Sequence, residues 1–487
     1  MNRLTKIVVA VVISTVTWNG YAQTRYTMDD VVQMAKSQSP FSKQAETRKE
    51  NRYWQYKFYR SNYNPQLRLS GSLPDYNQDY FQNRLDDGTY QFQQQEQTNS
   101  LVNLGLLQPI AFTGGTVSVN SSLNRYNDYL FDINQWNGTV VNIRLDQPIL
   151  NFNPLRWDKK TEPLRFEESK RSYVEEMEFI SQQAVNRFFT VLDAQINLQI
   201  ARFNLANNDT IYKIEQGRYN IGTTTKDKLL QAELQLLRSQ QDVTSARINL
   251  QNSKLELRSY IGLREDAEFE LVLPEEIPTL NVEVSQALLR ARENRADYIA
   301  FERRKVEADR EVAEARGQRF QINLTASYGL NNTGNMLDQV YDDPLSQQRI
   351  NVGFNVPVLD WGRNRARMRT ALANQKLNDY VIAQDEVIFE QEIMTQVAQF
   401  EVLLSQIEIT KKSDEVAQER YMVSQNRYLI GKIDITNLNI ALTEKDTAKR
   451  SYVGALRSFW DSYFSLRRLT LYDFSKNQLL YTPEMQN

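Results

Sequence analysis

Cysteine and histidine are both absent from the 487-residue sequence. Their absence excludes disulfides, most metal sites, and the Ser-His and Cys-His pairs that activate a catalytic nucleophile. Carboxylate or lysine catalysis is the remaining enzymatic option, but the acidic pairs lie where a helix begins or in polar turns, which favours capping and loop roles. These pairs are Asp29-Asp30, Asp86-Asp87 and Asp342-Asp343. We therefore predict a protein that is not an enzyme and that uses no metal or cofactor.

A strong net charge and long apolar runs are also missing. The formal charge is −2 with both signs mixed along the chain, so the sequence predicts no nucleic-acid partner. Beyond the N-terminus no apolar run has the length of a spanning helix, and the mean hydropathy is −0.58, which excludes a helical inner-membrane protein. Only 17 Gly and 12 Pro occur, without a linker, so one elongated helical architecture is favoured over two or three ordinary domains.

Residues 1–22 have the features of a secretory signal. Arg3 and Lys6 precede an apolar stretch that begins at Ile7, and Gly20 and Ala22 occupy the −3 and −1 positions of a cleavage site. The apolar stretch is shorter than the roughly 20 residues that a membrane anchor needs to cross a bilayer. We therefore predict cleavage before residue 23 and export from the cytoplasm.

The rest of the sequence contains two copies of one unit. The segment 147–152 (QPILNF) resembles 356–361 (VPVLDW), and their prolines are 209 positions apart. The segment 218–222 (RYNIG) resembles 427–431 (RYLIG) at the same spacing of 209. Because the spacing is constant over this whole interval, we infer an internal duplication of structure.

Upstream of each Pro motif, apolar and polar residues alternate, which predicts strands with one apolar face. The segment 66–70 resembles 321–325 at a spacing of 255, so the first copy carries 46 extra residues and four such strands, where the second has two. A soluble sandwich and a water-filled membrane barrel share this alternation, and periodicity does not choose between them. The clearest apolar series are Leu67/Leu69, Val102/Leu104/Leu106, Val117/Val119, Val141/Ile143/Leu145, Ile322/Leu324/Ala326 and Ile350/Val352/Phe354.

The segments between the strands favour the membrane barrel. The link 113–115 is short, whereas 74–98, 124–138 and 331–348 are long and polar, as periplasmic turns and external loops of such barrels are. Aromatic residues crowd the strand ends and loops, where they suit the interfaces of a bilayer. They include Tyr76, Tyr80, Phe81, Tyr90, Phe92, Tyr126, Tyr129, Phe131 and Trp136. Tyrosines in loops are also ordinary ligand-binding residues.

Each Pro motif is followed by a long helical pattern. Residues 167–216 and 363–429 contain neither Pro nor Gly, and a helix of this kind is roughly 80 to 100 Å long. Two adjacent apolar stripes in the first copy let one helix pack against a neighbour on each side, as a curved wall of helices requires. A plain antiparallel coiled coil would need one stripe and no strands. Turns at 220–222 and 429–431 then reverse the chain.

We divide the mature chain into two repeats and a tail. The first repeat, 23–274, contains a helix, barrel strands within about 66–148, a long helix at 155–220 and a returning helix at 225–262. The second, 275–474, contains a helix, barrel strands within about 319–358, a long helix at 363–429 and a returning helix at 434–470. Residues 475–487 form a C-terminal tail.

From about residue 26 to residue 474, the chain resembles the TolC-type outer-membrane efflux protein family. The segment 356–363 (VPVLDWGR) is similar to its strand-to-helix junction, and 218–222, followed by 229–232 (LLQA), is similar to its helix-tip motif. The segment 427–431 matches that tip motif again. Neither motif is specific alone, but their duplication at matched spacing behind a secretory signal is.

The resemblance implies a mainly α fold with a transmembrane β-barrel, in which a homotrimer forms an α-barrel/β-barrel duct. The duct would lie in the outer membrane of a Gram-negative bacterium, contact its lipid and extend into the periplasm. It would export small molecules or proteins passively, and its tips would dock onto a periplasmic adaptor (membrane-fusion) protein tied to an inner-membrane transporter. By motif matching, the docking residues would be Ile221, Gly222, Thr223, Ile430, Gly431 and Lys432. Both glycines also suit a turn that needs positive φ.

The sequence departs from the family at the tips. In the family, aspartates constrict the closed tip, and tyrosine, aspartate and arginine contacts hold it. Tyr428 matches the tyrosine, but Lys228 stands at the aspartate position, Ile433 at the arginine position, and Asn437 and Ile440 at pore aspartates. We therefore hypothesise a different set of gate residues. They are Tyr219, Asp227, Lys228, Tyr428, Asp434 and Asn437.

A second departure concerns the barrel. Members of the usual kind supply four strands per subunit, whereas this sequence predicts six, so a trimer would close eighteen strands instead of twelve. A hairpin outside the barrel is the competing interpretation of the 46 extra residues. The sequence also leaves two other functions open. One is a periplasmic coiled-coil scaffold, and the other is a carbohydrate- or protein-binding surface barrel without transport, with ligand contacts in 74–98 and 331–348.

Overall fold

The computed structural model describes residues 24–263, 268–274, 276–278, 280 and 282–481. The predicted secretory signal, 1–22, lies outside the described residues. The chain divides into two compact units, and each unit combines segments from both repeats. The first unit contains residues up to 44, 177–281 and 398–465. The second contains 45–176, 282–397 and the residues from 466 onward.

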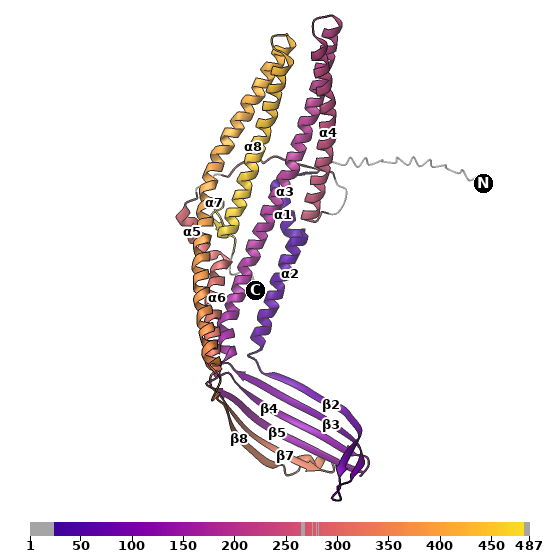
Figure 1. The fold of residues 1–487 in the computed structure, drawn as a ribbon, viewed down its shortest axis with the longest axis vertical. Helices are drawn as coiled ribbons and strands as arrows, with labels where there is room; N and C mark the ends of the chain where they lie inside the picture. Colours follow the sequence, from indigo (N-terminus) through magenta and orange to yellow (C-terminus); the bar gives the residue numbers. More distant parts are fainter. Residues whose placement is uncertain (1–23, 264–267, 275, 279, 281, 482–487) are drawn as a thin grey trace, which may run out of the picture. The chain divides into compact units, whose positions relative to one another are not determined.

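Helices dominate the fold, and the long ones repeat residue for residue (Figure 1). The two longest, α3 (Pro154–Asn220) and α7 (Arg363–Leu429), have 67 residues each. The returning helices α4 (Lys226–Ile261) and α8 (Ile435–Thr470) have 36 each. Both ends of each pair are 209 positions apart, so the fold is the predicted duplicated strand-plus-long-helix unit. The shorter helices are α1 (Met28–Gln38), α2 (Pro40–Ser61), α5 (Val284–Asn294), α6 (Ala296–Gly317) and the 3₁₀ turn η1 (Asp338–Tyr341).

Among the residues that the structure describes, none of the helices has a stretch apolar and long enough to traverse a bilayer.

Two small two-stranded sheets accompany the helices. In the first unit, β1 (Thr24–Tyr26) pairs in parallel with β6 (Phe269–Leu271). In the second unit, β9 (Tyr472–Asp473) pairs antiparallel with β10 (Gln478–Leu479), which places part of the C-terminal tail in a sheet.

The main sheet of the second unit has six antiparallel strands in the order β2-β3-β4-β5-β7-β8 (Figure 1). They are β2 (Gln66–Arg84), β3 (Tyr90–Ile110), β4 (Gly115–Asp128), β5 (Ile133–Ile149), β7 (Gln321–Gly334) and β8 (Leu345–Asn355). The six strands predicted for one subunit are therefore confirmed. The extra segment of the first copy adds strands to the sheet, because 66–72 of β2 pairs with β3 and β3 pairs with β4.

The strand register gathers the apolar residues on one face of this sheet. Leu69 lies opposite Leu104 and Leu67 opposite Leu106, which in turn lies opposite Val119, and the match continues to β8. Further pairs on this face are Val119↔Ile143, Ile143↔Tyr328, Leu324↔Val352 and Ile322↔Phe354. The other face is polar, with an ion pair between Arg144 and Asp146 (2.8 Å) and a hydrogen bond from Thr325 to Asp146 (3.0 Å). Alternation with period two therefore gives the sheet one apolar and one hydrophilic surface.

Most of the apolar face is open within the described second unit, although Val340 of η1 is buried beside Gly138 at one end of it. Ile350 is 79% exposed and Phe354 77%, and the corresponding leucines of β2 are similarly open. A soluble sandwich would bury such residues in a core. This face therefore needs a partner that is apolar itself.

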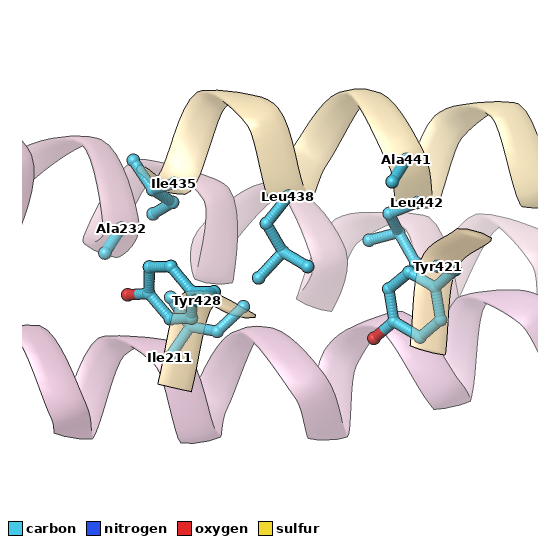
Figure 2. Close-up of a cluster of buried hydrophobic side chains, with 8 residues drawn as sticks. All are labelled: Ile211, Ala232, Tyr421, Tyr428, Ile435, Leu438, Ala441 and Leu442. Atoms are coloured by element: carbon cyan, nitrogen blue, oxygen red, sulfur yellow. The ribbon is translucent and has the colours of Figure 1, made fainter. Parts of the chain in front are cut away.

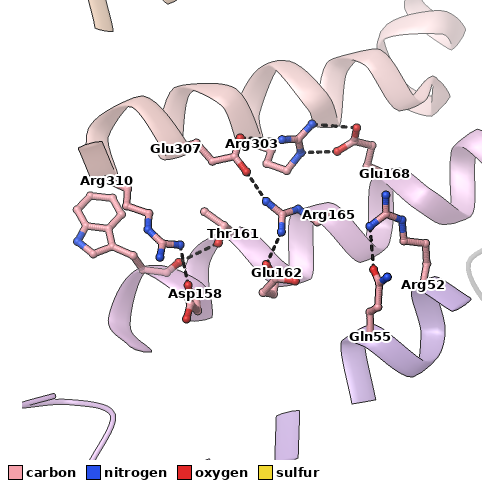
Figure 3. A network of polar contacts seen from close by, with 11 residues as sticks. Arg52, Gln55, Asp158, Thr161, Glu162, Arg165, Glu168, Arg303, Glu307 and Arg310 are labelled. Atoms are coloured by element: carbon pink, nitrogen blue, oxygen red, sulfur yellow. Dashed lines mark hydrogen bonds and ion pairs between the residues drawn. The ribbon is translucent and has the colours of Figure 1, made fainter. Parts of the chain in front are cut away.

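Ion pairs fix the register of α3 against α6 in the second unit (Figure 3). Arg303 forms a two-bond pair with Glu168 (2.5 and 3.1 Å), and Glu307 accepts from both Arg303 and Arg165 at 2.7 Å. Pairs of this kind contribute little stability one at a time. As a linked and partly buried series, they specify which residues of the two helices face each other.

Candidate functional site

The first tip, residues 218–228, reverses the chain between α3 and α4 with a glycine-ended helix cap. The amide of Gly222 donates to the carbonyl of Tyr219 (3.0 Å), and the amide of Thr223 donates to that of Arg218 (2.8 Å). Gly222 has φ +79°, a left-handed conformation that a side chain disfavours. This pair of bonds is the Schellman arrangement that closes many helices.

The second tip, residues 427–437, has the same backbone hydrogen bonds in its turn. Gly431 donates to the carbonyl of Tyr428 (3.0 Å), Lys432 donates to that of Arg427 (2.8 Å), and Gly431 has φ +74°. The six predicted docking residues therefore all lie in these two turns. At the outer end of each turn stands an exposed isoleucine, Ile221 at 75% and Ile430 at 67%.

A buried carboxylate joins the two tips within the first unit. Glu215 of α3 is 3% exposed, and it accepts hydrogen bonds from the Tyr428 hydroxyl (2.7 Å), Arg218 (2.9 Å) and Thr224 (2.9 Å). The Arg218 guanidinium also lies over the Tyr428 ring, 5.2 Å from its centroid. All of the donors come from the two tips, so this cluster fixes one tip against the other. We call it the Glu215 node.

The charge state of the node follows from these contacts. Burial raises the pKa of Glu215, but the hydrogen bonds from Tyr428, Thr224 and Arg218 and the charge of Arg218 outweigh burial, so this pKa lies below its usual value. Burial, together with the bond to Glu215, raises the pKa of the Tyr428 hydroxyl, which therefore keeps its proton and donates. In the Glu215 node, an ionised carboxylate therefore accepts hydrogen bonds from neutral hydroxyl groups and from a guanidinium cation.

An apolar cluster packs beside the node (Figure 2). The Tyr428 ring, 2% exposed, lies among aliphatic side chains from α3, α4 and α8. Its members are Ile211, Ala232, Tyr421, Tyr428, Ile435, Leu438, Ala441 and Leu442. Aromatic and aliphatic burial of this extent is the main favourable term that holds the two helix pairs together.

The structure brings some of the predicted gate residues together and leaves others apart. Asp434 accepts from the amide and the side chain of Asn437, both at 2.9 Å, and so caps α8. Tyr428 belongs to the Glu215 node. Tyr219 is 41% exposed, and within the described part of the chain neither Asp227 nor Lys228 has an ion pair.

Sequence reasoning missed Glu215, Arg218 and Thr224 as members of the site. The duplication carried a signal that could have found them: at the spacing of 209, Glu215 corresponds to Ser424 and Thr224 to Ile433. An acidic residue present beside only one of two equivalent tips points to a contact that the other tip lacks. Among the described residues, no group of three or more acidic side chains could hold a metal ion.

Solved structures show the same fold. CusC, described as forming a transmembrane channel, is 14% identical to this chain. The match covers 91% of this chain and 91% of CusC, with a TM-score of 0.64. The CmeC outer membrane channel of Campylobacter jejuni is 16% identical, with 91% of this chain and 85% of that chain covered and a TM-score of 0.64. The outer membrane protein VceC of Vibrio cholerae is 16% identical, with 91% and 95% covered and a TM-score of 0.61.

A search by sequence among curated proteins found no match. The sequence profile described as outer membrane efflux protein does match, over residues 117–263 and 284–470. These two segments contain most of both repeats, including both tips. The predicted resemblance is therefore confirmed, and the chain belongs to the outer membrane efflux protein family.

Proposed function

We propose that this protein is the passive outer-membrane exit duct of an efflux or secretion system, assembled as a homotrimer. The observation that carries the proposal is the six-stranded sheet, with a largely open apolar face and a polar opposite face. Lipid is the apolar partner that such a face fits, and water fits the other face. An efflux-protein family is not an enzyme family, which is consistent with a duct that performs no chemistry.

The free edges of the sheet support assembly from several copies. Among the described strands, β2 and β8 each have one unpaired side. In a bilayer, unpaired backbone groups must be satisfied, so an open sheet has to be closed by further copies. Three copies would supply eighteen strands, a barrel wide enough for an aqueous channel.

The tips support docking onto an adaptor. Ile221 and Ile430 present large apolar side chains at two turns of the same geometry, and a partner would remove both side chains from water. We place the periplasmic adaptor on residues 221–223 and 430–432, with the inner-membrane transporter behind it.

Gating also belongs to the tips. In our proposal, Tyr219, Asp227, Lys228, Tyr428, Asp434 and Asn437 keep the closed state, and the Glu215 node anchors Tyr428. Charge reversal by Lys228→Glu should change single-channel conductance, and an unchanged conductance would remove Lys228 from the gate.

The decisive experiment tests the duct itself. Residues 23–487 are purified and tested for their need of detergent, their mass and their conductance in planar bilayers. A detergent-requiring trimer that conducts ions supports the proposal. A water-soluble protein, or one without conductance, would contradict it and favour a scaffold or a surface binder.

Docking needs a separate test. Ile221→Glu combined with Ile430→Glu should abolish crosslinking to the adaptor in cells while conductance is retained. Lys226→Glu changes an exposed charge within the first tip but outside the predicted docking residues, and it serves as the matched control, with crosslinking expected to remain. Equal loss in both variants would show that charge, and not the isoleucines, governs docking.

A further inference from the structure

The far ends of β2 and β3 form a hairpin that the rest of the sheet does not support. Pairing of β3 with β4 begins at Gln97, so residues 90–96 pair only with β2. A register shift between Ser72 and Asp75 separates this part of β2 from the part that belongs to the six-stranded sheet. We call residues 75–99 the distal hairpin.

Composition changes at the same boundary. Residues 101–110 contain all of the aliphatic side chains of β3, whereas 90–100 (YQFQQQEQTNS) contain none. Every residue of β2 is exposed. Leu85, in the turn, is the one aliphatic residue among 75–99. The distal hairpin therefore offers almost no aliphatic surface to a hydrocarbon layer, and an aromatic belt at a membrane interface does not account for its rings.

The rings of the distal hairpin are gathered on one face. Residues directly opposite in the ladder share a face, and the pairs Tyr80↔Gln94, Gln82↔Phe92 and Arg84↔Tyr90 alternate with pairs on the other face. The aromatic face holds Tyr76, Tyr80, Tyr90 and Phe92, which are 52%, 60%, 58% and 68% exposed. The opposite face holds one ring, Phe81. Two-stranded ribbons are marginally stable by themselves, so four open rings on one face need a reason other than packing.

The base of the distal hairpin is held in place. The amide of Tyr129 donates to the carbonyl of Glu96 (2.9 Å), the hydroxyls of Thr98 and Tyr129 are 2.9 Å apart, and Tyr126 donates to Gln97 (2.9 Å). The Tyr76 hydroxyl donates to Glu96 (3.1 Å), which orients its ring. A ribbon anchored in this way presents its rings in a fixed row.

We propose that the aromatic face of the distal hairpin binds a neutral polysaccharide chain, with sugar rings stacked on Tyr80 and Phe92. Tyr80 and Phe92 are diagonal neighbours in the ladder, roughly 7–8 Å apart at the backbone. Aromatic rings cover the apolar faces of pyranoses, and the amides of Gln78, Gln82 and Gln94 on the same face donate to and accept from hydroxyl groups. That this hairpin stands outside the cell rests on the proposed function; its binding chemistry does not.

Charge selects among possible occupants. The distal hairpin carries five acidic residues against one basic residue, Arg84. The acidic residues are Asp75, Asp79, Asp86, Asp87 and Glu96. A surface of this sign repels phosphorylated lipopolysaccharide and nucleic acid, whereas a neutral chain approaching from the medium meets no repulsion.

The test uses the full-length protein in a detergent without a sugar headgroup. Cellohexaose, maltohexaose and mannohexaose are titrated in a calorimeter, and at least one of them should bind. Loss of two stacking rings in the Tyr80→Ala/Phe92→Ala variant should weaken binding by about fivefold to a hundredfold, since each aromatic contact contributes about 0.5–1.5 kcal/mol and 1.4 kcal/mol corresponds to tenfold. Phe81→Ala, on the opposite face, is the matched control and should bind as the wild type does.

Three results would overturn the inference: no binding of any hexasaccharide, equal loss in the Phe81→Ala control, or binding only of lipopolysaccharide vesicles or of a protein. Conductance of the same preparations separates this inference from the proposed function. A conducting trimer that ignores all three sugars overturns only the sugar site. A protein that binds sugar but does not conduct overturns only the duct.

Discussion

The two tips have the same backbone conformation but differ in their side chains. Both turns have the same two cap bonds and a glycine near φ +75°, and both begin a returning helix after a side-chain cap. Yet Tyr428 of the second tip is 2% exposed and bonded to Glu215, whereas the equivalent Tyr219 of the first tip is 41% exposed. The two repeats therefore have the same turn, but the side chains around the two turns pack differently.

This difference separates two requirements. Reversing the chain depends on the backbone and is met in the same way twice, since a helix cap needs only a glycine and free carbonyls. Fixing one tip against the other needs complementary side chains. The Glu215 carboxylate of α3 and the Tyr428 hydroxyl of α7 form such a contact, and it is not repeated by Tyr219. The exposed Tyr219 side chain of the first tip is therefore open to contacts outside this chain.

The largest expected effect is the loss of the buried tyrosine. Tyr428→Ala should lower the free energy of tip opening by about 3–5 kcal/mol, because a large ring is removed from a packed cluster. Tyr219→Ala, at the equivalent position of the first tip, should leave that energy nearly unchanged. Hydrogen exchange of the amides in both turns measures the two values, and equal losses would contradict the asymmetry.

The sequence was enough to predict the repeating part of the fold. The apolar stripes and the absence of Pro and Gly gave the long helices within a few residues of their observed ends, and alternation gave six strands. It was not enough to predict the Glu215 node, because its partners lie 9 and 213 positions away and only packing brings them together. The predicted gate set combined exposed and buried residues, such as Tyr219 and Tyr428, for a similar reason. A motif match identifies equivalent positions in the sequence but does not show which of them are buried.

The second prediction concerns Glu215, whose counterpart Ser424 carries no charge. Glu215→Gln keeps the shape of the side chain but removes charge-assisted bonds, so tip opening should become easier by about 1.5–3 kcal/mol at neutral pH. In the wild type, the pKa of Glu215 is lowered from 4.5, so its stabilisation is present above that value and is lost as pH falls through the folded pKa. The free energy of tip opening in the wild type should therefore fall below about pH 4.5. In Glu215→Gln the same free energy should depend less on pH, because the titrating carboxyl is gone.

Ser424→Ala is the matched control for Glu215→Gln, since it alters the equivalent position of the second repeat. It should leave both the opening energy and its pH dependence close to the wild-type values. Hydrogen exchange measured from pH 3 to pH 7 (roughly the range that brackets the carboxylate titration) checks both variants. If Glu215→Gln proved as acid-sensitive as the wild type, a group other than Glu215 would control the tip.

The third prediction tests the shared backbone. Gly222→Ala and Gly431→Ala should each cost about 1–2 kcal/mol, because an added side chain is strained at positive φ although no atom lies within 4 Å. The two costs should be equal. Gly217→Ala, inside α3 and also without neighbours, should instead stabilise the helix by about 0.5–1 kcal/mol. Unequal costs at the two turns would show that their surroundings differ more than their geometry does.

The smallest expected effect is at the caps of the returning helices. Asp434 accepts the Asn437 amide at 2.9 Å, whereas Thr225 accepts the equivalent Lys228 amide at 3.5 Å. Asp434→Ala should therefore weaken the first turn of α8 by about 1 kcal/mol, since an acceptor and a favourable charge at a helix N-terminus are both lost. Thr225→Ala should weaken the first turn of α4 by only about a few tenths of a kcal/mol, because its cap bond is longer. Asp434→Asn, which keeps an acceptor, should retain most of the stability that Asp434→Ala loses. Exchange rates of the Asn437 and Lys228 amides measure the difference, and a larger effect at Thr225 would mean that the longer bond is the stronger one.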